Sequence, residues 1–426
     1  MERILERDRA YIQILEEELV PAMGCTEPIA IAYAAAKARE LLGGLPERVL
    51  AEVSGNIIKN VKSVVVPNTG GLRGIEAAAG AGIVAGRADL LLEVISQVTS
   101  EEREAIKKYV EEGRVQVQCL DSELVFDLCI TVSRGEETAR ARIANYHTNL
   151  VRLEHNGQVL LDLPVDGEEE TELTDRSVLN MKDIFDFAEA VELDRVRALL
   201  DRQIECNMAI AQEGLTGNYG ANIGQVIRNT SRSDDPIAKA KAAAAAGSDA
   251  RMSGCELPVI INSGSGNQGI TASVPVIVYG REIGASQERL YRALLLSNLV
   301  TIHQKTRIGR LSAYCGAVSA GAAAGAGIAY LDGGGYEEVI HTVVNALAIV
   351  SGIICDGAKA SCAGKIAAAV EAGVLGYRMY QQGQQFYGGD GILSRGVEAT
   401  LDNVGRLGKI GMRPTDKEIL SIMLEQ

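Results

Sequence analysis

Three cysteines in the last third of the chain carry the clearest potential for chemistry. Cys315 stands at the head of an Ala- and Gly-rich stretch, and Cys355 and Cys362 bracket a six-residue segment. A straight helix would separate the last two by about 10 Å, but Asp356-Gly357 favours a turn, with Cys362 opening the next helix. Three thiolates suit an iron–sulfur cluster that leaves one iron open. Inert buried thiols are the commonest fate of free cysteines, and the spacing alone leaves both interpretations open.

Zinc matches these cysteines less well, because a structural zinc site takes four ligands, usually Cys and His. Of the four histidines, His147 and His155 lie in a β-rich stretch, which leaves His303 and His341 for a site near the cysteines. The residue types therefore favour a cluster over a zinc ion.

Cys25 has a different setting, because it lies just before a helix that is expected to begin near Pro28. A helix N-terminus lowers the pKa of a thiol, so we expect a partly exposed thiolate that acts as a base or a nucleophile. A purely structural residue at the helix entry explains the position equally well. Cys119 is expected in the core, on the apolar face of a strand. Cys129, Cys206 and Cys255 show no partner pattern.

Short polar side chains beside glycines form three candidate binding loops. The segment 262–269, Asn-Ser-Gly-Ser-Gly-Asn-Gln-Gly, can present backbone N–H groups to a carboxylate or a phosphate. It lacks the Gly-Lys-Ser/Thr of a P-loop, and we expect a strand after it, which argues against a dinucleotide fingerprint. Segments 54–60 and 68–71 have a similar composition. Each loop alone is explained as well by a plain turn.

The composition of the whole chain narrows the class of partner. The 426 residues, 47% hydrophobic and 23% charged, are typical of a soluble globular protein with a sizeable core. A net charge of −14 argues against nucleic acid and anionic membranes as partners. With no Trp and 4% aromatic residues, base stacking is disfavoured and a small substrate is favoured. The charged first residues and the scattered cysteines predict a cytoplasmic protein.

The pattern of elements predicts an α+β fold in two parts. In the first part we expect helices at 2–19 and 29–42, two strands within 48–66, a helix capped by Thr99 and Glu102, and a hairpin at Asn156-Gly157. After about residue 180 helices dominate, at 181–191, 193–213, 235–250, 286–303, 312–331, 336–354 and 362–382. The uncharged stretch 311–331 is interpreted as a buried central helix, because it is rich in Ala and Gly.

An acidic, turn-rich run at 166–175 separates the two parts. We therefore predict an α+β N-terminal domain, residues 1–165, that carries Cys25, and a mostly α-helical domain, residues 175–426, that carries the other three candidate cysteines. Separate hydrophobic cores are expected for the β-rich block 114–162 and for the helical region after 180, with the active site in the cleft between them.

Five segments taken together resemble one family. They are Gly24–Pro28, Ser54–Asn56 with Lys59-Asn60, Gly264–Gly269, Gly309–Gly316 and Cys355–Cys362. In this order, over almost the whole chain, they are similar to the L-cysteine desulfidases, which belong to the superfamily of the iron–sulfur L-serine dehydratase α chain. The resemblance implies that the helical part is a domain of the dehydratase α-chain type.

The resemblance also implies an activity. It is that of a pyridoxal-independent lyase with a [4Fe-4S] cluster, which converts L-cysteine into sulfide, ammonia and pyruvate by β-elimination. Cys315, Cys355 and Cys362 match the family's cluster ligands, and Cys25 matches its proton acceptor. A soft iron–sulfur centre suits a departing thiolate, which favours L-cysteine over L-serine. We expect a homo-oligomer with a small amino-acid substrate.

The expected substrate contacts are Asn56, Lys59, Asn68, Thr69, Ser265, Asn267 and Gln268, with Lys59, Arg310 or Lys359 as charge partners for the carboxylate. One alternative function is an iron–sulfur L-serine dehydratase. A pyridoxal phosphate lyase is disfavoured, because no Ser-x-Lys-x-Arg-Gly-like lysine site is evident. A metal-free small-molecule binding protein, with all cysteines simply buried, is the alternative from a different class.

Overall fold

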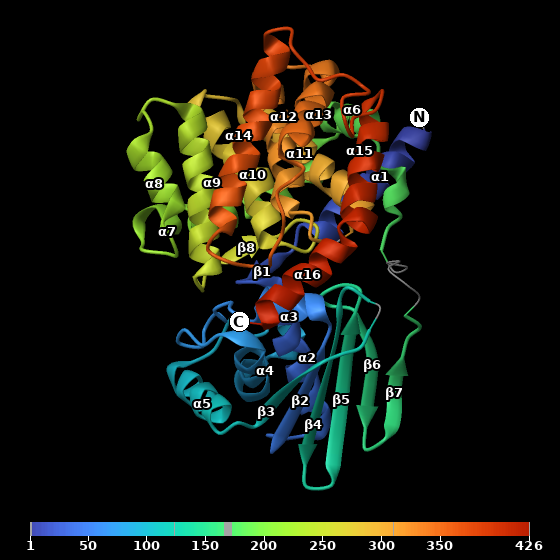
Figure 1. The fold of residues 1–426 in the computed structure, drawn as a ribbon, viewed down its shortest axis with the longest axis vertical. Coiled ribbons are helices and arrows are strands. Elements are labelled where there is room, and N and C mark those ends of the chain that lie inside the picture. The colour runs from blue at the N-terminus through green and yellow to red at the C-terminus, as the bar shows by residue number, and fades with distance from the viewer. Residues whose placement is uncertain (1, 123, 166–172, 310, 426) are drawn as a thin grey trace.

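The computed structural model describes residues 2–122, 124–165, 173–309 and 311–425, and its α+β fold agrees with the prediction (Figure 1). A mostly antiparallel sheet with helices forms the lower part of Figure 1, and a group of helices forms the upper part. The chain passes from the sheet to the group of helices near residue 165, where the strand pattern of the sequence ends. The division into domains 1–165 and 175–426 itself stays a prediction.

The lower part is built on one six-stranded sheet, of order β3-β2-β4-β5-β6-β7. Among the strands that the structure describes in this sheet, only β2 and β3 pair in parallel. Helix α2 packs on β4 and β5, α4 packs on α2, and α5 packs on α4. The strands are β2 (Arg48–Val53), β3 (Val115–Cys119), β4 (Asp127–Arg134), β5 (Glu137–Ala144), β6 (Leu150–His155) and β7 (Gln158–Asp162). The helices are α2 (Thr26–Leu42), α3 (Gly55–Val61), α4 (Gly74–Ala85), η1 (Ala88–Glu93) and α5 (Ser100–Glu111).

The upper part contains the seven helices expected after residue 180, with ends that differ by a few residues, and further helices that were not expected. They are η2 (Arg176–Val178), α6 (Met181–Ala190), η3 (Leu193–Arg195), α7 (Arg197–Thr216), α8 (Ile223–Thr230), α9 (Pro236–Met252), α10 (Gly266–Glu282), α11 (Gln287–Ile308), α12 (Gly316–Leu331), α13 (Tyr336–Val350), α14 (Cys362–Gln381), α15 (Val397–Arg406), η4 (Leu407–Gly411) and α16 (Arg413–Leu424).

Helix α12 lies at the centre of the upper part, and its residues from Ala317 to Leu331 are all buried. A Cβ atom added at Gly325 would lie 2.6 Å from the backbone of Gly373 in α14. Glycine is therefore required where these two helices cross. The interpretation of this stretch as a buried central helix is confirmed, and among the described residues we find no helix that could cross a membrane.

Three local predictions are wrong. The second strand expected within 48–66 is helix α3, because Ile57 and Val61 are buried one helical turn apart rather than in alternation. The segment after the 262–269 loop is helix α10 rather than a strand, since burial among helices overrides the strand preference of its β-branched residues. Cys119 is exposed rather than in the core, because it ends the edge strand β3.

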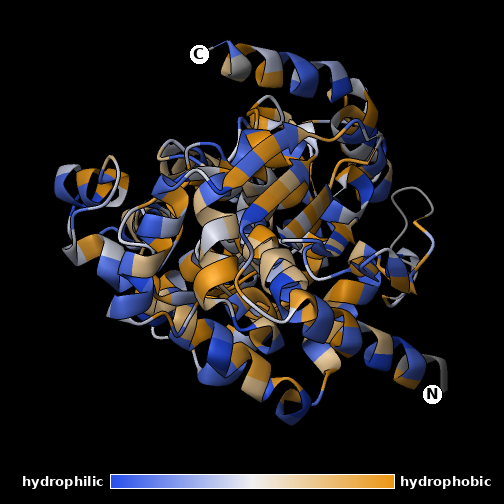
Figure 2. Cartoon of the chain, turned by 90° about the horizontal axis from the view of Figure 1, so that it is seen from below, coloured by the Kyte–Doolittle hydropathy of each residue, from blue (hydrophilic) through white to orange (hydrophobic). Residues whose placement is uncertain are grey.

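Both ends of the chain cross between the two parts. Strand β1 (Pro21–Met23) pairs with β8 (Pro258–Ile260), and α1 (Glu2–Glu18) joins the upper part, where Tyr11 meets Phe187 with ring centroids 5.3 Å apart. Helix α16 returns to α3 and lies where the two parts meet in Figure 1, and the helix that ends at C stands at the edge of the molecule in Figure 2. The main buried apolar cluster runs through both parts, so the expectation of separate cores is wrong.

Candidate active site

A cavity of about 100 Å³ lies where the two parts of the chain meet. Residues before position 150 and residues after position 250 both line it, so neither part forms it alone. Its lining includes Cys25, Glu27, Lys59, Asn60, His147, Arg251, Ser265, Asn267, Gln268, Lys305, Cys315, Cys355 and Cys362. The structure thus brings together the four cysteines that the sequence singled out. We call this space the cysteine cavity.

The three C-terminal cysteines reach the cysteine cavity from the ends of two helices and a turn. Cys315 directly precedes α12, and Cys362 is the first residue of α14, as expected. The backbone N–H of Cys355 donates to the carbonyl of Ala313 at 2.7 Å, and that of Cys315 donates to the carbonyl of Ile353 at 3.2 Å. These two bonds hold the segments around Cys315 and Cys355 side by side.

A turn at Gly357 connects Cys355 to Cys362. Gly357 has φ of 92°, and a Cβ atom there would lie 2.4 Å from the carbonyl oxygen of Lys59. Only glycine combines this backbone conformation with so close an approach to α3. The turn that carries two of the cysteines therefore rests directly on the lower part of the molecule.

The charges of the three thiolates would oppose one another. Burial, together with the smaller effects of the neighbouring Cys355 and Cys362, raises the pKa of Cys315 to about 12. Burial also raises the pKa of Cys362. Such thiols ionise in place only with a cationic partner, and three soft sulfur donors suit iron. The donor set therefore fits an iron–sulfur cluster held by Cys315, Cys355 and Cys362.

The described residues form no site for a single metal ion. Within the described ranges, no three His, Cys, Asp or Glu side chains are grouped in a way that could hold one metal ion. A multi-iron cluster differs in this respect, because its ligands surround a body that is several atoms wide.

Cys25 precedes the first residue of α2, as expected, but its surroundings do not favour the thiolate expected there. The thiol is buried, and its Sγ donates a hydrogen bond to Oε2 of Glu27 at 3.0 Å. Burial and the negative charge of Glu27 raise the pKa of Cys25 well above the ordinary value. The expectation of an exposed thiolate with a lowered pKa is wrong, because these two effects outweigh the helix N-terminus.

Glu27 lines the cysteine cavity beside Cys25, and no role was expected for it from the sequence. Its carboxylate also accepts hydrogen bonds from the hydroxyl of Thr26 at 3.1 Å and from Nδ2 of Asn60 at 2.9 Å. Burial raises the pKa of Glu27, but His147 and the bond from Cys25 outweigh it, so the pKa lies below the ordinary value. A carboxylate in the first turn of a helix, two residues after a candidate catalytic cysteine, is the signal that could have revealed it.

The loop 262–269 places three of its expected substrate residues in the cysteine cavity, namely Ser265, Asn267 and Gln268. Lys59 also lines the cavity, but its ammonium is paired with Asp416 of α16. The positive charge of Lys59 is therefore balanced by the carboxylate of Asp416.

Several expected residues are not among those that line the cysteine cavity. Asn68 donates to the carbonyl of Ile95 and accepts from Arg103, and Thr69 donates to the carbonyl of Val66. Asn56 lies in α3, and Lys359 lies in the segment between Cys355 and Cys362. Neither of these two is found in the lining. Arg310 lies outside the described residues.

Arg251 in α9 is a second residue that the sequence reasoning missed. It lines the cysteine cavity with only 3% of its surface exposed. Its position in an Ala-rich helix carries no sequence signal for a binding site, because only the packing of α9 against α10 brings it to the cavity.

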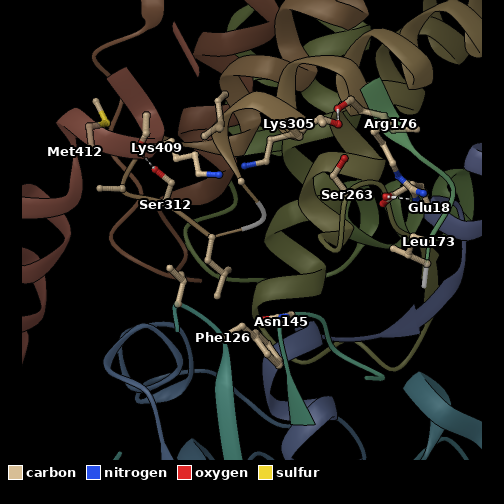
Figure 3. Close-up of a pocket in the computed structure, with 18 of the residues that line it drawn as sticks. Glu18, Phe126, Asn145, Leu173, Arg176, Ser263, Lys305, Ser312, Lys409 and Met412 are labelled. Atoms are coloured by element: carbon tan, nitrogen blue, oxygen red, sulfur yellow. Dashed lines mark hydrogen bonds and ion pairs between the residues drawn. The ribbon is translucent and has the colours of Figure 1, made fainter. Parts of the chain in front are cut away.

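A larger cavity of about 650 Å³ adjoins the cysteine cavity, with Lys305, Leu311 and Ser312 lining both. Figure 3 shows this larger cavity, into which the side chains of Lys305 and Lys409 point. Residues of α16 and of the segment before it form part of its wall, including Met412, Arg413 and Asp416. With about 650 Å³, the larger cavity has room for a small molecule next to the cysteine cavity.

The fold combines a helical part, which carries three of the four cysteines of the cysteine cavity, with a smaller α+β part. A profile of the family described as "Serine dehydratase alpha chain" matches residues 89–421, which is most of the chain. The chain therefore belongs to the serine dehydratase alpha chain family.

Curated relatives match over almost the whole length of this chain and of their own. One is a UPF0597 protein of Desulfitobacterium hafniense, 60% identical over 100% of this chain and 99% of its own length. A UPF0597 protein of Lachnoclostridium phytofermentans is 50% identical, covering 98% and 99%. A UPF0597 protein of Treponema denticola is 49% identical, covering 97% of each chain.

Proposed function

We propose that this protein is a pyridoxal-independent iron–sulfur lyase that converts L-cysteine into sulfide, ammonia and pyruvate. The observation that carries the proposal is the single cavity lined by Cys25 together with Cys315, Cys355 and Cys362. Membership in the serine dehydratase alpha chain family supports a lyase of this type. In the proposal, the three C-terminal cysteines hold a [4Fe-4S] cluster and Cys25 faces the substrate.

The proton chemistry falls to Cys25 and Glu27. Cys25 takes the α-proton of the substrate, and because it is a neutral thiol at rest, its own proton passes along the existing hydrogen bond to Glu27. The electrons of the broken Cα–H bond form the Cα–Cβ double bond as the bond from Cβ to sulfur breaks. Sulfide leaves, and the aminoacrylate that remains tautomerises and hydrolyses to pyruvate and ammonia.

The leaving group needs help of a different kind. A cluster with one open iron, when bound, would act as a Lewis acid toward the β-substituent of the substrate. Soft iron prefers sulfur to oxygen as a partner, which is why we propose L-cysteine rather than L-serine as the substrate. The buried position of Cys25 and Glu27 keeps bulk water away from the proton that they share.

An L-serine dehydratase is the second candidate function. The match to the serine dehydratase alpha chain profile favours it, because that name describes the loss of water from serine. The same residues would serve the reaction, with hydroxide in place of sulfide as the leaving group.

The experiment that tests the proposal is anaerobic purification, followed by assays of iron, of acid-labile sulfide and of pyruvate release. We expect a brown protein that bleaches in air and has a higher kcat/KM for L-cysteine than for L-serine. A higher kcat/KM for L-serine would establish the second candidate instead. A colourless protein that contains no iron would contradict both and support the metal-free binding protein. A yellow protein whose absorbance shifts with borohydride would indicate pyridoxal phosphate.

A further inference from the structure

The guanidinium of Arg251 is a buried positive charge in the cysteine cavity. It makes no hydrogen bond or ion pair with any residue that the structure describes, and its Nε is one of the buried polar atoms without a partner. Buried charges in proteins are normally paired, because removing an ion from water is costly. The other cation in the cavity that was expected to bind substrate, Lys59, is paired with Asp416. Arg251 is thus available to an anionic ligand.

The fold reserves space for this guanidinium. A Cβ atom added at Gly266, the first residue of α10, would lie 2.3 Å from Nε and 2.7 Å from Cζ of Arg251. Glycine is therefore required at position 266 if the guanidinium is to keep its place. This contact puts the positive charge at the first turn of α10, whose next two residues, Asn267 and Gln268, line the same cavity.

Three amide oxygens complement the positive charge. The side-chain oxygens of Asn60, Asn267 and Gln268 are buried, and each accepts no hydrogen bond from the residues in the described ranges. All three residues line the cysteine cavity. The amide of Asn60 is oriented by its Nδ2, which donates to Glu27 at 2.9 Å and so leaves the oxygen free to accept. These acceptors suit a ligand with several N–H donors, such as an ammonium group.

We propose that Arg251 binds the carboxylate of an α-amino acid, while the amide oxygens of Asn60, Asn267 and Gln268 receive its ammonium group. A planar guanidinium matches a carboxylate with two parallel hydrogen bonds, which a lysine cannot do. The inference rests on the proposed function and restricts its substrates to compounds that have a free carboxylate. The competing explanation is that Arg251 serves only as a countercharge for Glu27, whose charged form it stabilises.

The test uses two ligands that differ in the group that Arg251 is proposed to bind. L-alanine has the carboxylate and the ammonium but no leaving group, and 2-aminoethanethiol has the ammonium and thiol but no carboxylate. Titration calorimetry on anaerobically purified Arg251→Gln should show L-alanine bound about a hundredfold more weakly than by the unmodified protein. Binding of 2-aminoethanethiol should be unchanged. The KM for L-cysteine should rise far more than kcat falls.

Two further variants keep the test decisive. Arg251→Lys keeps the charge but loses the planar pair of donors. Its affinity for L-alanine should therefore lie between that of the unmodified protein and that of Arg251→Gln. This variant also serves if Arg251→Gln fails to fold, which thermal unfolding would reveal. Arg39→Gln is the matched control, because Arg39 is half-buried, binds the carbonyls of Ile83 and Gly86, and is absent from the cavity lining. It should bind L-alanine as the unmodified protein does.

Three outcomes would overturn the inference. The first is an unchanged affinity of Arg251→Gln for L-alanine. The second is an equal loss of affinity for L-alanine and 2-aminoethanethiol, which is expected if Arg251 is only a countercharge for Glu27. The third is that the unmodified protein does not bind L-alanine. Measurements of iron content and activity distinguish failure of this inference from failure of the proposed function. If the protein contains no iron but its L-alanine affinity depends on Arg251, the inference stands and the lyase function is contradicted. If the protein contains iron and is active but Arg251→Gln leaves the KM unchanged, the lyase function stands and the inference is contradicted.

Discussion

The thiol of Cys25 donates a hydrogen bond to the Glu27 carboxylate, with 3.0 Å between Sγ and Oε2. Both groups are buried, and the bond joins an acid whose pKa is raised to a base whose pKa is lowered. The resting pair is therefore a neutral thiol and a carboxylate. Any reaction in which Cys25 accepts a proton must also move the thiol proton, and Glu27 is the acceptor that the structure provides.

Replacing Glu27 by Gln should lower kcat by about 10²-fold or more, because the thiol then has no carboxylate to receive its proton. Removal of the negative charge should also lower the pKa of Cys25, since that charge raises it in the unmodified protein. The pH dependence of Cys25 alkylation, followed by mass spectrometry, measures this second effect without reference to turnover. Iron content should not change.

Glu76→Gln is the matched control, since Glu76 lies in the first turn of α4 but is exposed to solvent. It should behave as the unmodified protein. Full turnover in Glu27→Gln would remove Glu27 from the mechanism.

Replacing Cys25 by Ala should lower turnover by about 10²–10⁴-fold and leave the iron content intact, because a general base is lost but no cluster ligand. Cys25→Ser should not restore activity, since the pKa of a hydroxyl is too high for a base near neutrality. Iron analysis beside pyruvate release measures both effects. If Cys25→Ala loses iron, Cys25 is a ligand, and if it stays fully active, Cys25 has no catalytic role.

Structural elements that depend on residues close together in the sequence could be predicted, whereas contacts that depend on tertiary packing could not. The capping box of Thr99 with Glu102 and the hairpin at Asn156-Gly157 depend on residues within three positions, and both are present. The starts of α12 and α14 at Cys315 and Cys362 are equally local. These signals gave the fold class and most helices.

The candidate site shows the limit of such signals. Lys59 and Asp416 pair across 357 positions, and no local pattern in either segment marks the contact. The pKa of Cys25 was predicted with the wrong sign, because the helix N-terminus is visible in the sequence but burial beside a carboxylate is not. Arg251 was missed for the same reason, since only the position of α10 makes it part of a cavity.

Replacing Asp416 by Asn should lower the free energy of unfolding by about 3–5 kcal/mol, because it leaves a buried ammonium without its partner. Lys59 is 2% exposed, and its pair with Asp416 holds α16 against α3. Chemical unfolding followed by circular dichroism measures the change. The control is Asp234→Asn, whose partner Arg232 is exposed, and its effect should stay below about 1 kcal/mol. Equal effects of both substitutions would show that the Lys59–Asp416 pair is not important for stability.

The stability of the protein should depend on the protonation of Asp249 in α9. Burial raises the pKa of this carboxyl to about 6 from 3.8, although the backbone N–H groups of Gly224 and Ile223 favour its charged form. Because the folded state then binds the proton more tightly than the unfolded state, the stabilisation is complete below pH 3.8 and is lost as the pH rises through about 6.

Asp249→Asn should remove this pH dependence of the unfolding free energy. The contribution of Asp249 changes by at most about 3 kcal/mol between pH values below 3.8 and above 6. The hydrogen bond from the N–H of Gly224 can persist, since the side-chain oxygen of Asn also accepts. Unfolding free energies of both proteins at a series of pH values measure the difference. An identical pH dependence in the two proteins would contradict the role given to Asp249.

The most direct test of the central claim is the iron and sulfide content of three anaerobically purified variants: Cys315→Ala, Cys355→Ala and Cys362→Ala. Each should lose most of its iron and all of its turnover together, because a cluster held by two thiolates is readily lost. Cys129→Ala is the control, since Cys129 is buried in β4 and accepts a hydrogen bond from Arg140 away from the cavity. It should keep its iron. Full iron content in any of the three variants would contradict the assignment of that cysteine as a cluster ligand.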